Sequence, residues 1–303
     1  MNCKKNDSLF QKRLEEKTAQ IEEILKSYLP EKSGYQQNII EAMEYSLMAG
    51  GKRLRPMLMQ EAYYLFGGEG NLIEPFMAAI EMIHTYSLVH DDLPAMDNDE
   101  YRRGRKTTHI VYGEAMAILA GDALLNYAFE TACRAFDMEG ADGKRIGKAL
   151  KILAQKAGIH GMAGGQAVDV ESEGQQITGE KLDFIYRLKT GALIESSMMI
   201  GAVLSGASQN QIQTMESIAG KVGMAFQIQD DILDVEGSRE ELGKPAHSDE
   251  KNKKFTYVAW KGLEDAKKEV KRLSMEAMEE LKTLHPEDPY LEMLLESLIH
   301  RKK

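Results

Sequence analysis

Two segments of the chain concentrate carboxylates in patterns that could hold metal ions. Residues 90–105, HDDLPAMDNDEYRRGR, carry five acidic side chains and then three arginines. Residues 226–235, FQIQDDILDV, place four polar side chains at intervals of three and four, on one helical face: Gln227, Asp230, Asp231 and Asp234. Carboxylates suit hard divalent ions, and Mg²⁺ usually completes its octahedron with waters and phosphate oxygens. We therefore predict a diphosphate site in which Mg²⁺ bridges two acidic elements.

Clusters of charged residues are more often solvated surface than metal sites. We therefore weigh a surface interpretation for both segments. The second cluster interrupts a run of Phe, Ile and Val, and no lysine lies within a turn to balance its mutually repelling carboxylates. The first ends an apolar helical stretch, and Pro94 forces the chain out of the helix soon after Asp92. Asp91 and Asp97 are thereby gathered with Asp92 at a helix end. Two such aspartate sets favour facing metal-binding walls.

The elements that carry these residues are predicted to be helices. Ile39, Met43 and Leu47 recur every four residues, and no convincing alternating strand is present. Single glycines and prolines punctuate the chain as helix ends would, without a flexible linker. With 303 residues and 43% hydrophobic content the chain can bury a substantial core. We expect one all-α domain over residues 1–303, a helical bundle of about ten or more helices.

Composition excludes several classes of partner. The net charge of −10, from 48 acidic and 38 basic residues, gives no basic footprint for nucleic acid or anionic membrane. Cys3 and Cys133 are too few for a disulfide framework, which suits a reducing compartment. The N-terminus lacks an apolar signal region, and no apolar run is long enough to cross a bilayer. A cytoplasmic protein without membrane insertion is expected, with local cations holding any anionic ligand.

Six motifs between residues 50 and 257 carry a family resemblance. They are GGKRLRP at 50–56, DDLPAMD at 91–97 with RRG after it, GGQAVD at 164–169, KTGALI at 189–194, FQIQDDILD at 226–234 and LGK at 242–244. In kind and order they resemble the trans-isoprenyl diphosphate synthases, most closely the bacterial farnesyl diphosphate synthases. The resemblance implies a class I isoprenoid synthase fold, with antiparallel helices around a deep central cavity and the aspartate motifs facing each other near its mouth. It also implies a homodimer.

The resemblance further implies a head-to-tail condensation. Isopentenyl diphosphate would react with dimethylallyl and then geranyl diphosphate, through ionisation of the allylic substrate, condensation and elimination of a proton. Three Mg²⁺ ions per site, with Mn²⁺ as an alternative, would stabilise the departing diphosphate. The ligands expected by similarity are Asp91, Asp92, Asp97, Asp230, Asp231 and Asp234, of which Asp92, Asp231 and Asp234 could bind directly or support the others. The expected catalytic set is Asp91, Asp92, Asp97, Lys189, Thr190, Gln227 and Asp230.

By similarity the polar and basic residues divide between two diphosphates. Those that would bind the allylic diphosphate are Arg102, Lys189, Thr190, Gln227, Lys244 and Lys254. Those that would bind isopentenyl diphosphate, in a pocket that needs no metal, are Lys52, Arg55, His84 and Arg103. Arginine suits this role because its planar fork bonds two phosphate oxygens at once and stays protonated. Thr190 and Gln227 would also flank the carbocation.

Product length should depend on the residues below the first aspartate motif. Tyr86 precedes Asp91 by five residues, about 7.5 Å along a helix, and with Ser87 it could stop a growing chain. The four residues between Asp92 and Asp97 also resemble the bacterial enzymes that stop at fifteen carbons. Geranyl and geranylgeranyl products remain alternatives, and Tyr86 could instead be ordinary core.

Some residues depart from the family pattern or have simpler explanations. Lys106 stands where proline is common, and His247 stands where glycine is usual, which puts the role of Lys254 in doubt. The glycines of GGQAVD are interpreted as a helix break or a close-packing point and not as a phosphate loop, because no strand precedes them. His90 is interpreted as a structural residue. Two rival functions are a class I terpene cyclase, which would not use a second anion pocket, and a non-catalytic subunit of a heteromeric synthase, which would be expected to lose acidic ligands.

Overall fold

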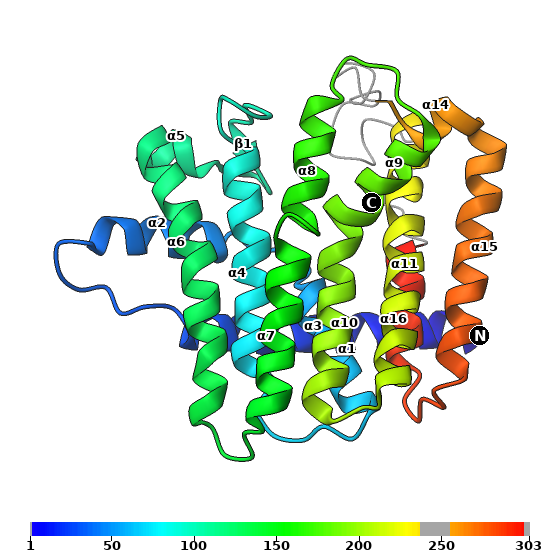
Figure 1. Cartoon of the computed structure of the whole chain (residues 1–303), viewed down its shortest axis with the longest axis horizontal. Helices are drawn as coiled ribbons and strands as arrows, with labels where there is room; N and C mark the ends of the chain where they lie inside the picture. The colour runs from blue at the N-terminus through cyan, green and yellow to red at the C-terminus, as the bar shows by residue number, and fades with distance from the viewer. Residues whose placement is uncertain (1, 237–254, 300–303) are drawn as a thin grey trace. The chain divides into compact units, whose positions relative to one another are not determined.

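The computed structural model describes residues 2–236 and 255–299, and nearly all of its regular structure is helical (Figure 1). This confirms the all-α prediction. Contacts divide the chain into two compact units. Unit 1 comprises residues 1–60 and 69–150, and unit 2 comprises residues 61–68 and 151–303. The expectation of a single domain stays a prediction.

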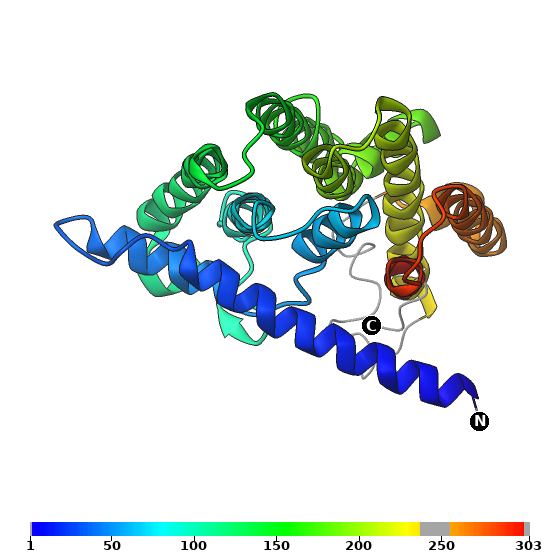
Figure 2. The same ribbon diagram turned by 90° about the horizontal axis from the view of Figure 1, so that it is seen from below.

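Unit 1 contains the N-terminal helices and a small hairpin. Its elements are α1 (Asn2–Ser27), α2 (Gln37–Leu47), the start of α3 (Leu54–Leu65), α4 (Glu74–Asp91), β1 (Tyr101–Arg102), β2 (Arg105–Lys106), α5 (Thr108–Tyr112), α6 (Glu114–Cys133), the 3₁₀ turn η1 (Arg134–Asp137) and the start of α7 (Gly143–Ala157). Helices α4 and α6 lie side by side (Figures 1 and 2). α4 is buried over Pro75–Ile83, because its apolar residues leave no polar stripe for solvent.

Small residues let α6 approach α4 closely. A Cβ added at Gly121 of α6 would lie 2.1 Å from Nε2 of His90, at the end of α4. His90 Nε2 also lies 3.1 Å from the Ile118 carbonyl oxygen. The histidine therefore has a structural contact on α6, in agreement with the interpretation from sequence. The packing of α6 holds the end of α4, where the first aspartate motif begins.

The hairpin is an element of a type that the sequence did not predict. Tyr101 pairs with Lys106, and Arg102 pairs with Arg105, in an antiparallel ladder. The two turn residues, Arg103 and Gly104, have φ values of 52° and 75°, as in the tight turns that suit a twisted hairpin. Strands of two residues are too short to leave an alternating pattern. The hairpin places Arg102 on a strand and Arg103 in the turn.

Unit 2 is built on three neighbouring long helices. Its elements are the end of α3, the end of α7, α8 (Met162–Glu171), α9 (Gly179–Ile185), the π-helical η2 (Tyr186–Gly191), α10 (Ala192–Ser205), α11 (Gln209–Glu236), α14 (Tyr257–Lys261), α15 (Leu263–Lys282) and α16 (Tyr290–Ile299). α11 packs against both α10 and α15. A Cβ at Gly223 of α11 would lie 2.8 Å from the Cα of Gly191, the last residue of η2. Glycine at this position therefore permits α11 to approach η2 closely.

No helix among the described residues is both long enough and apolar enough to span a bilayer. The longest, α11, carries charged residues along its length, among them Glu216, Lys221 and Asp230.

Candidate active site

The first aspartate motif forms a compact turn at the end of α4. The Asp97 backbone N–H donates to the Asp91 carbonyl oxygen at 2.8 Å, and the Asn98 N–H donates to the Leu93 carbonyl oxygen at 3.1 Å. Asn98 has a φ of 53°, a conformation that asparagine tolerates. Asp91 is half-buried and Asp97 is exposed. The turn thus brings Asp91 and Asp97 together, as the sequence predicted.

Asp92 of the same motif is bonded to an arginine. It is buried, and its Oδ1 accepts a hydrogen bond from Arg102 Nε at 2.7 Å and lies 2.6 Å from Arg102 Nη2 in an ion pair. Burial raises the pKa of Asp92, and the Arg102 guanidinium opposes that rise. A cavity of about 30 Å³ adjoins this pair and is also lined by Arg103. Arg102 Nη2 also lies 3.7 Å from Asp99 Oδ2, and the charge of Asp91 also acts on the guanidinium. Asp92 therefore orients Arg102 beside the first aspartate motif.

The residues predicted for the isopentenyl diphosphate pocket gather around His84 of α4. Burial lowers the pKa of His84 well below its usual value, and nearby guanidiniums lower it further: those of Arg55, Arg103, Arg102 and Arg53. We call these four arginines and His84 the His84 cluster. Burial also lowers the pKa of Arg55 and of Arg103. The charge of Arg103 lowers the pKa of Arg55 further, and the charges of Arg53 and Arg102 do the same for Arg103. Several positively charged arginines near one neutral imidazole are suited to binding a polyvalent anion.

Gly50 and Gly51 of GGKRLRP lie against Arg103, and Gly51 makes room for it. The Arg103 guanidinium donates to the Gly50 carbonyl oxygen. A Cβ at Gly51, where φ is 128°, would lie 2.5 Å from Arg103 Nη1. Lys52 is exposed immediately after the glycines. The motif therefore brings its own basic residues and Arg103 to the same part of unit 1.

The second aspartate motif occupies one face of α11 in unit 2. Asp230 is exposed and Asp234 half-buried, whereas Asp231 is 3% exposed. The Asp231 Oδ2 accepts hydrogen bonds from the Tyr186 hydroxyl at 2.6 Å and from the Tyr257 backbone N–H at 2.7 Å. Of the two roles considered for Asp231, these contacts favour support of neighbouring elements over direct binding of an ion.

The π-helix η2 presents two predicted catalytic residues. Lys189 Nζ donates to Asp169 Oδ2 at 2.6 Å, and Thr190 Oγ1 donates to Gln227 Oε1 at 2.9 Å. We call these four residues the Lys189 cluster. Single π turns occur often at functional sites. A Cβ at Gly165 would lie 2.3 Å from the Lys189 backbone nitrogen, so the GGQAVD glycines are a close-packing point, as interpreted from sequence.

The remaining predicted residues have varied settings. Tyr86 is half-buried, with its ring centroid 5.8 Å from that of His90, and burial raises its pKa. The Ser87 hydroxyl donates to the His84 carbonyl oxygen at 2.8 Å. Three other residues discussed from sequence lie outside the described residues: Lys244, His247 and Lys254.

The sequence analysis missed four residues that support these clusters. Asp169 accepts a hydrogen bond from Lys189, and Tyr186 donates one to Asp231. Arg53 and Glu81 form a buried pair under the GGKRLRP turn, with 2.8 Å between Arg53 Nη1 and Glu81 Oε1. A carboxylate such as Glu81, in the otherwise apolar AAIEMI run, is a signal that could have indicated a buried pair.

The acidic residues fit a magnesium site by their chemistry. All the predicted ligands are carboxylates, and the Asp91–Asp97 turn offers two of them at one helix end. In the part of the chain that the structure describes, no three acidic, histidine or cysteine side chains gather around one point. An ion here would take few carboxylates and fill its shell with waters and phosphate oxygens, which is the coordination that Mg²⁺ favours.

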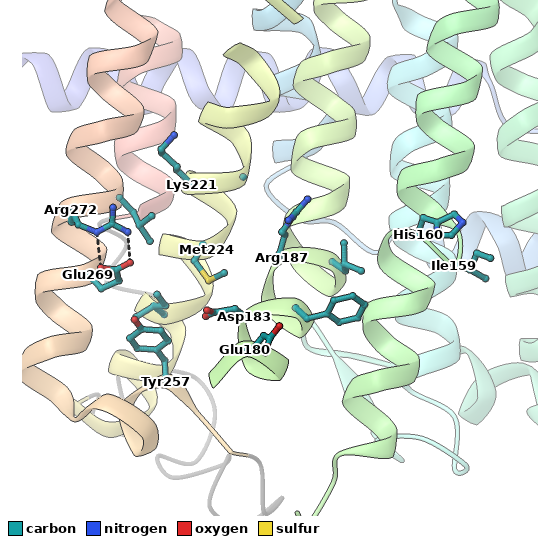
Figure 3. A pocket seen from close by; sticks show the side chains of 15 residues that line it. Ile159, His160, Glu180, Asp183, Arg187, Lys221, Met224, Tyr257, Glu269 and Arg272 are labelled. Carbon is teal, nitrogen blue, oxygen red and sulfur yellow. Dashed lines mark hydrogen bonds and ion pairs between the residues drawn. The ribbon is translucent and has the colours of Figure 1, made fainter. Parts of the chain in front are cut away.

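A larger cavity, of about 720 Å³, lies elsewhere in unit 2 (Figure 3). α9, η2, α11, α14 and α15 contribute side chains to it, including Asp183, Arg187 and Tyr257. Arg272 at its edge donates two hydrogen bonds to Glu269. None of the residues lining this cavity is one that the sequence predicts for the reaction, so we do not assign the chemistry to it.

Comparison with known proteins identifies relatives over most of the chain. Residues 36–288 match the polyprenyl synthetase family. The farnesyl diphosphate synthase of Geobacillus stearothermophilus is 45% identical over 257 residues, covering 85% of this chain and 86% of that protein. A chloroplastic geranylgeranyl pyrophosphate synthase of Catharanthus roseus is 47% identical over 250 residues, covering 82% of this chain and 70% of that protein.

A solved structure also resembles the chain. It is a geranyltransferase from Helicobacter pylori in complex with magnesium and isoprenyl diphosphate, with a TM-score of 0.81 and 33% identity. The match covers 96% of this chain and 95% of that one. The resemblance that the six motifs indicated is therefore confirmed.

Proposed function

Because the chain belongs to the polyprenyl synthetase family, we propose that it is a prenyltransferase that condenses isopentenyl diphosphate head-to-tail with an allylic diphosphate. The observation that carries this proposal is the His84 cluster, in which guanidiniums surround a neutral imidazole. Such a cluster supplies a site for a diphosphate without metal. The Asp91–Asp97 turn in the same unit supplies carboxylates for a second diphosphate held through Mg²⁺.

The reaction separates into ionisation, condensation and elimination. The bond between C1 and oxygen of the allylic substrate breaks, and the double bond of isopentenyl diphosphate attacks the resulting cation. A proton then leaves the new chain for the released diphosphate. Mg²⁺, when bound, supplies positive charge that stabilises the departing oxygens. Three ions per site are proposed, with Mn²⁺ as an alternative.

The chain's own residues have separate tasks in this scheme. Lys52, Arg55, His84 and Arg103 bind isopentenyl diphosphate, while Arg102 and Lys189 bind the allylic diphosphate. The hydrogen-bonded Thr190 and Gln227 turn oxygen atoms toward the cation and stabilise it electrostatically. Asp92 keeps Arg102 in place through their hydrogen bond and ion pair. Apolar walls exclude water, which would otherwise quench the cation.

Farnesyl diphosphate is the proposed main product, with dimethylallyl and then geranyl diphosphate as allylic substrates. Support comes from the Geobacillus relative, although the Catharanthus relative keeps a geranylgeranyl product as the alternative. Tyr86 is half-buried one to two turns before Asp91 and is proposed to limit chain length. We expect Tyr86→Ala to give longer products at similar turnover, measured by chromatography of the dephosphorylated alcohols. An unchanged product length would contradict this role.

Incubation with dimethylallyl and isopentenyl diphosphates plus Mg²⁺ tests the activity. Condensation that requires both substrates supports the proposal. A hydrocarbon formed from one longer allylic diphosphate would indicate a terpene cyclase, and no turnover would indicate a non-catalytic subunit. The homodimer and the cytoplasmic location stay predictions, testable by light scattering and by cell fractionation.

A further inference from the structure

A buried ion pair lies beneath the GGKRLRP turn of unit 1. Arg53 and Glu81 are each 2% exposed, and Arg53 Nη1 donates to Glu81 Oε1 at 2.8 Å. Arg53 Nη2 donates to the Leu47 carbonyl oxygen at 2.8 Å and lies 3.5 Å from Glu22 Oε1. One guanidinium therefore ties the turn to α1, to the end of α2 and to α4.

The backbone of Arg53 is in a conformation that few side chains adopt. Its φ is 50°, in the left-handed region that an L-residue occupies at a cost in free energy. The residue stands between Lys52 and Arg55, two of the groups assigned to isopentenyl diphosphate. The buried contacts of the Arg53 guanidinium offset this cost in free energy. They therefore determine the direction in which the turn points the side chains of Lys52 and Arg55.

Glu81 is an anion close to the same cations that a diphosphate would contact. It lies three residues before His84, on the same face of α4. Its charge raises the pKa of Arg55 and of Arg103, opposing the effect of burial. Among the described residues, the buried Arg55 Nε has no hydrogen-bond partner. Glu81 could thus compete with a diphosphate for these arginines if Arg53 did not already occupy it.

We propose that Arg53 is a positioning residue for isopentenyl diphosphate, which holds the GGKRLRP turn in place and keeps Glu81 from pairing with Arg55 or Arg103. This inference rests on the proposed function, since it takes the His84 cluster to be a diphosphate pocket. Arg53 does not touch the substrate itself, but it determines whether Arg55 and Arg103 can bind it.

The test uses Arg53→Met and the double variant Arg53→Met with Glu81→Leu. In the single variant the unpaired carboxylate should capture a neighbouring arginine, so the KM for isopentenyl diphosphate should rise roughly tenfold or more. The KM for the allylic substrate should stay close to that of the wild type. The double variant removes the competing carboxylate and should recover part of the lost affinity, whereas a merely structural role predicts a loss at least as large as that of the single variant.

Binding of inorganic diphosphate in EDTA, measured by calorimetry, gives a readout that needs no turnover. Weaker binding by Arg53→Met, partly restored in the double variant, supports the inference. Equal binding by wild type and Arg53→Met, or no recovery in the double variant, overturns it while leaving the proposed function intact. No metal-free binding by the wild type overturns the pocket assignment, and this inference falls with it.

Glu195→Gln is the matched control. Glu195 is 3% exposed and pairs with Lys156 in unit 2, so this variant also disturbs a buried ion pair. It should lower Tm without changing metal-free diphosphate affinity, and an equal loss of affinity there would overturn the inference. If Arg53→Met does not fold, Arg53→Lys replaces it, because lysine keeps the charge but not the fork. Weaker binding by Arg53→Lys supports the inference, and unchanged binding overturns it.

Discussion

The His84 cluster of unit 1 and the Lys189 cluster of unit 2 differ in how their cations are balanced. Around His84, four guanidiniums act together and lower the pKa of the imidazole. In the Lys189 cluster, the ammonium already has a carboxylate partner, Asp169, at 2.6 Å. In the first cluster Arg53 and Arg102 are also paired, with Glu81 and Asp92, so the positive charge available for an anion is that of Arg55 and Arg103. In the second cluster the single cation is paired with its carboxylate.

This difference offers a physical reason for two modes of diphosphate binding. An excess of guanidinium groups can hold a diphosphate directly, through forked hydrogen bonds. A cluster whose lysine is already paired, beside an acidic motif such as Asp230 and Asp234, repels a diphosphate unless divalent ions add positive charge. In the proposed reaction only the allylic substrate loses its diphosphate, so only that substrate would need the metal as an electron-withdrawing group.

The test with the largest expected effect removes predicted metal ligands. Asp91→Asn and Asp230→Asn should each lower kcat by about 10² to 10³-fold, because charge on the leaving oxygens is then poorly stabilised. Both should leave metal-free diphosphate affinity at the His84 cluster unchanged. Steady-state kinetics over a range of Mg²⁺ concentrations, with calorimetry in EDTA, measures both quantities. Full kcat in both variants would remove the distinction between the clusters.

A second test compares one variant from each cluster, and each variant should affect a different substrate. Arg55→Met should raise the KM for isopentenyl diphosphate, and Lys189→Met should raise the KM for the allylic diphosphate, each by about tenfold or more for the loss of a charged hydrogen bond. Each variant should spare the other substrate. Initial rates with one substrate varied at a time give the four KM values. A rise in both values for either variant would mean that the clusters do not serve separate substrates.

A third test asks whether Asp231 supports structure or binds metal. Asp231→Asn keeps the shape but weakens acceptance from Tyr186 and Tyr257, so the free energy of unfolding should fall by about 1 to 3 kcal/mol. The Mg²⁺ concentration for half-maximal activity should stay the same. Thermal unfolding and a Mg²⁺ titration measure the two effects, with Asp230→Asn as the control that shifts the titration. The opposite result would make Asp231 a ligand.

The smallest expected effect is on acid stability. The pKa of His84 is well below its usual value in the folded chain, through burial and then the arginines, while the unfolded chain titrates near 6.5. The unfolded state therefore binds more protons below about pH 6.5, and stability is lost as pH falls from there toward the lowered pKa. The loss is at most about 1.4 kcal/mol per pH unit.

His84→Gln should remove this part of the acid sensitivity. Comparing Tm of variant and wild type at several pH values between about 7.5 and 5.5 measures it. Parallel curves would show that neither burial nor the arginines lower the pKa of His84, and would weaken the contrast between the two clusters.

Helical periodicity predicted the fold class, and the motifs predicted some of the residues that lie together. Thr190 with Gln227, and Asp91 with Asp97, are brought together as expected. The hairpin of Arg102 and Arg103 was not predicted, because two-residue strands have no period to detect. The Arg53–Glu81 pair was also missed, since spacing along the chain does not reveal pairing across 28 positions.

The π-helix η2 has a consequence for the evolution of this chain. One residue of an α-helix turns through about 100°, so a π turn shifts the angular phase of everything that follows it by that amount. Deleting a single residue within Tyr186–Gly191 would restore regular winding. It would also rotate Thr190 away from Gln227, or swing the whole of α10 out of register with α11. Length in this short stretch is therefore constrained more tightly than side-chain identity alone would suggest.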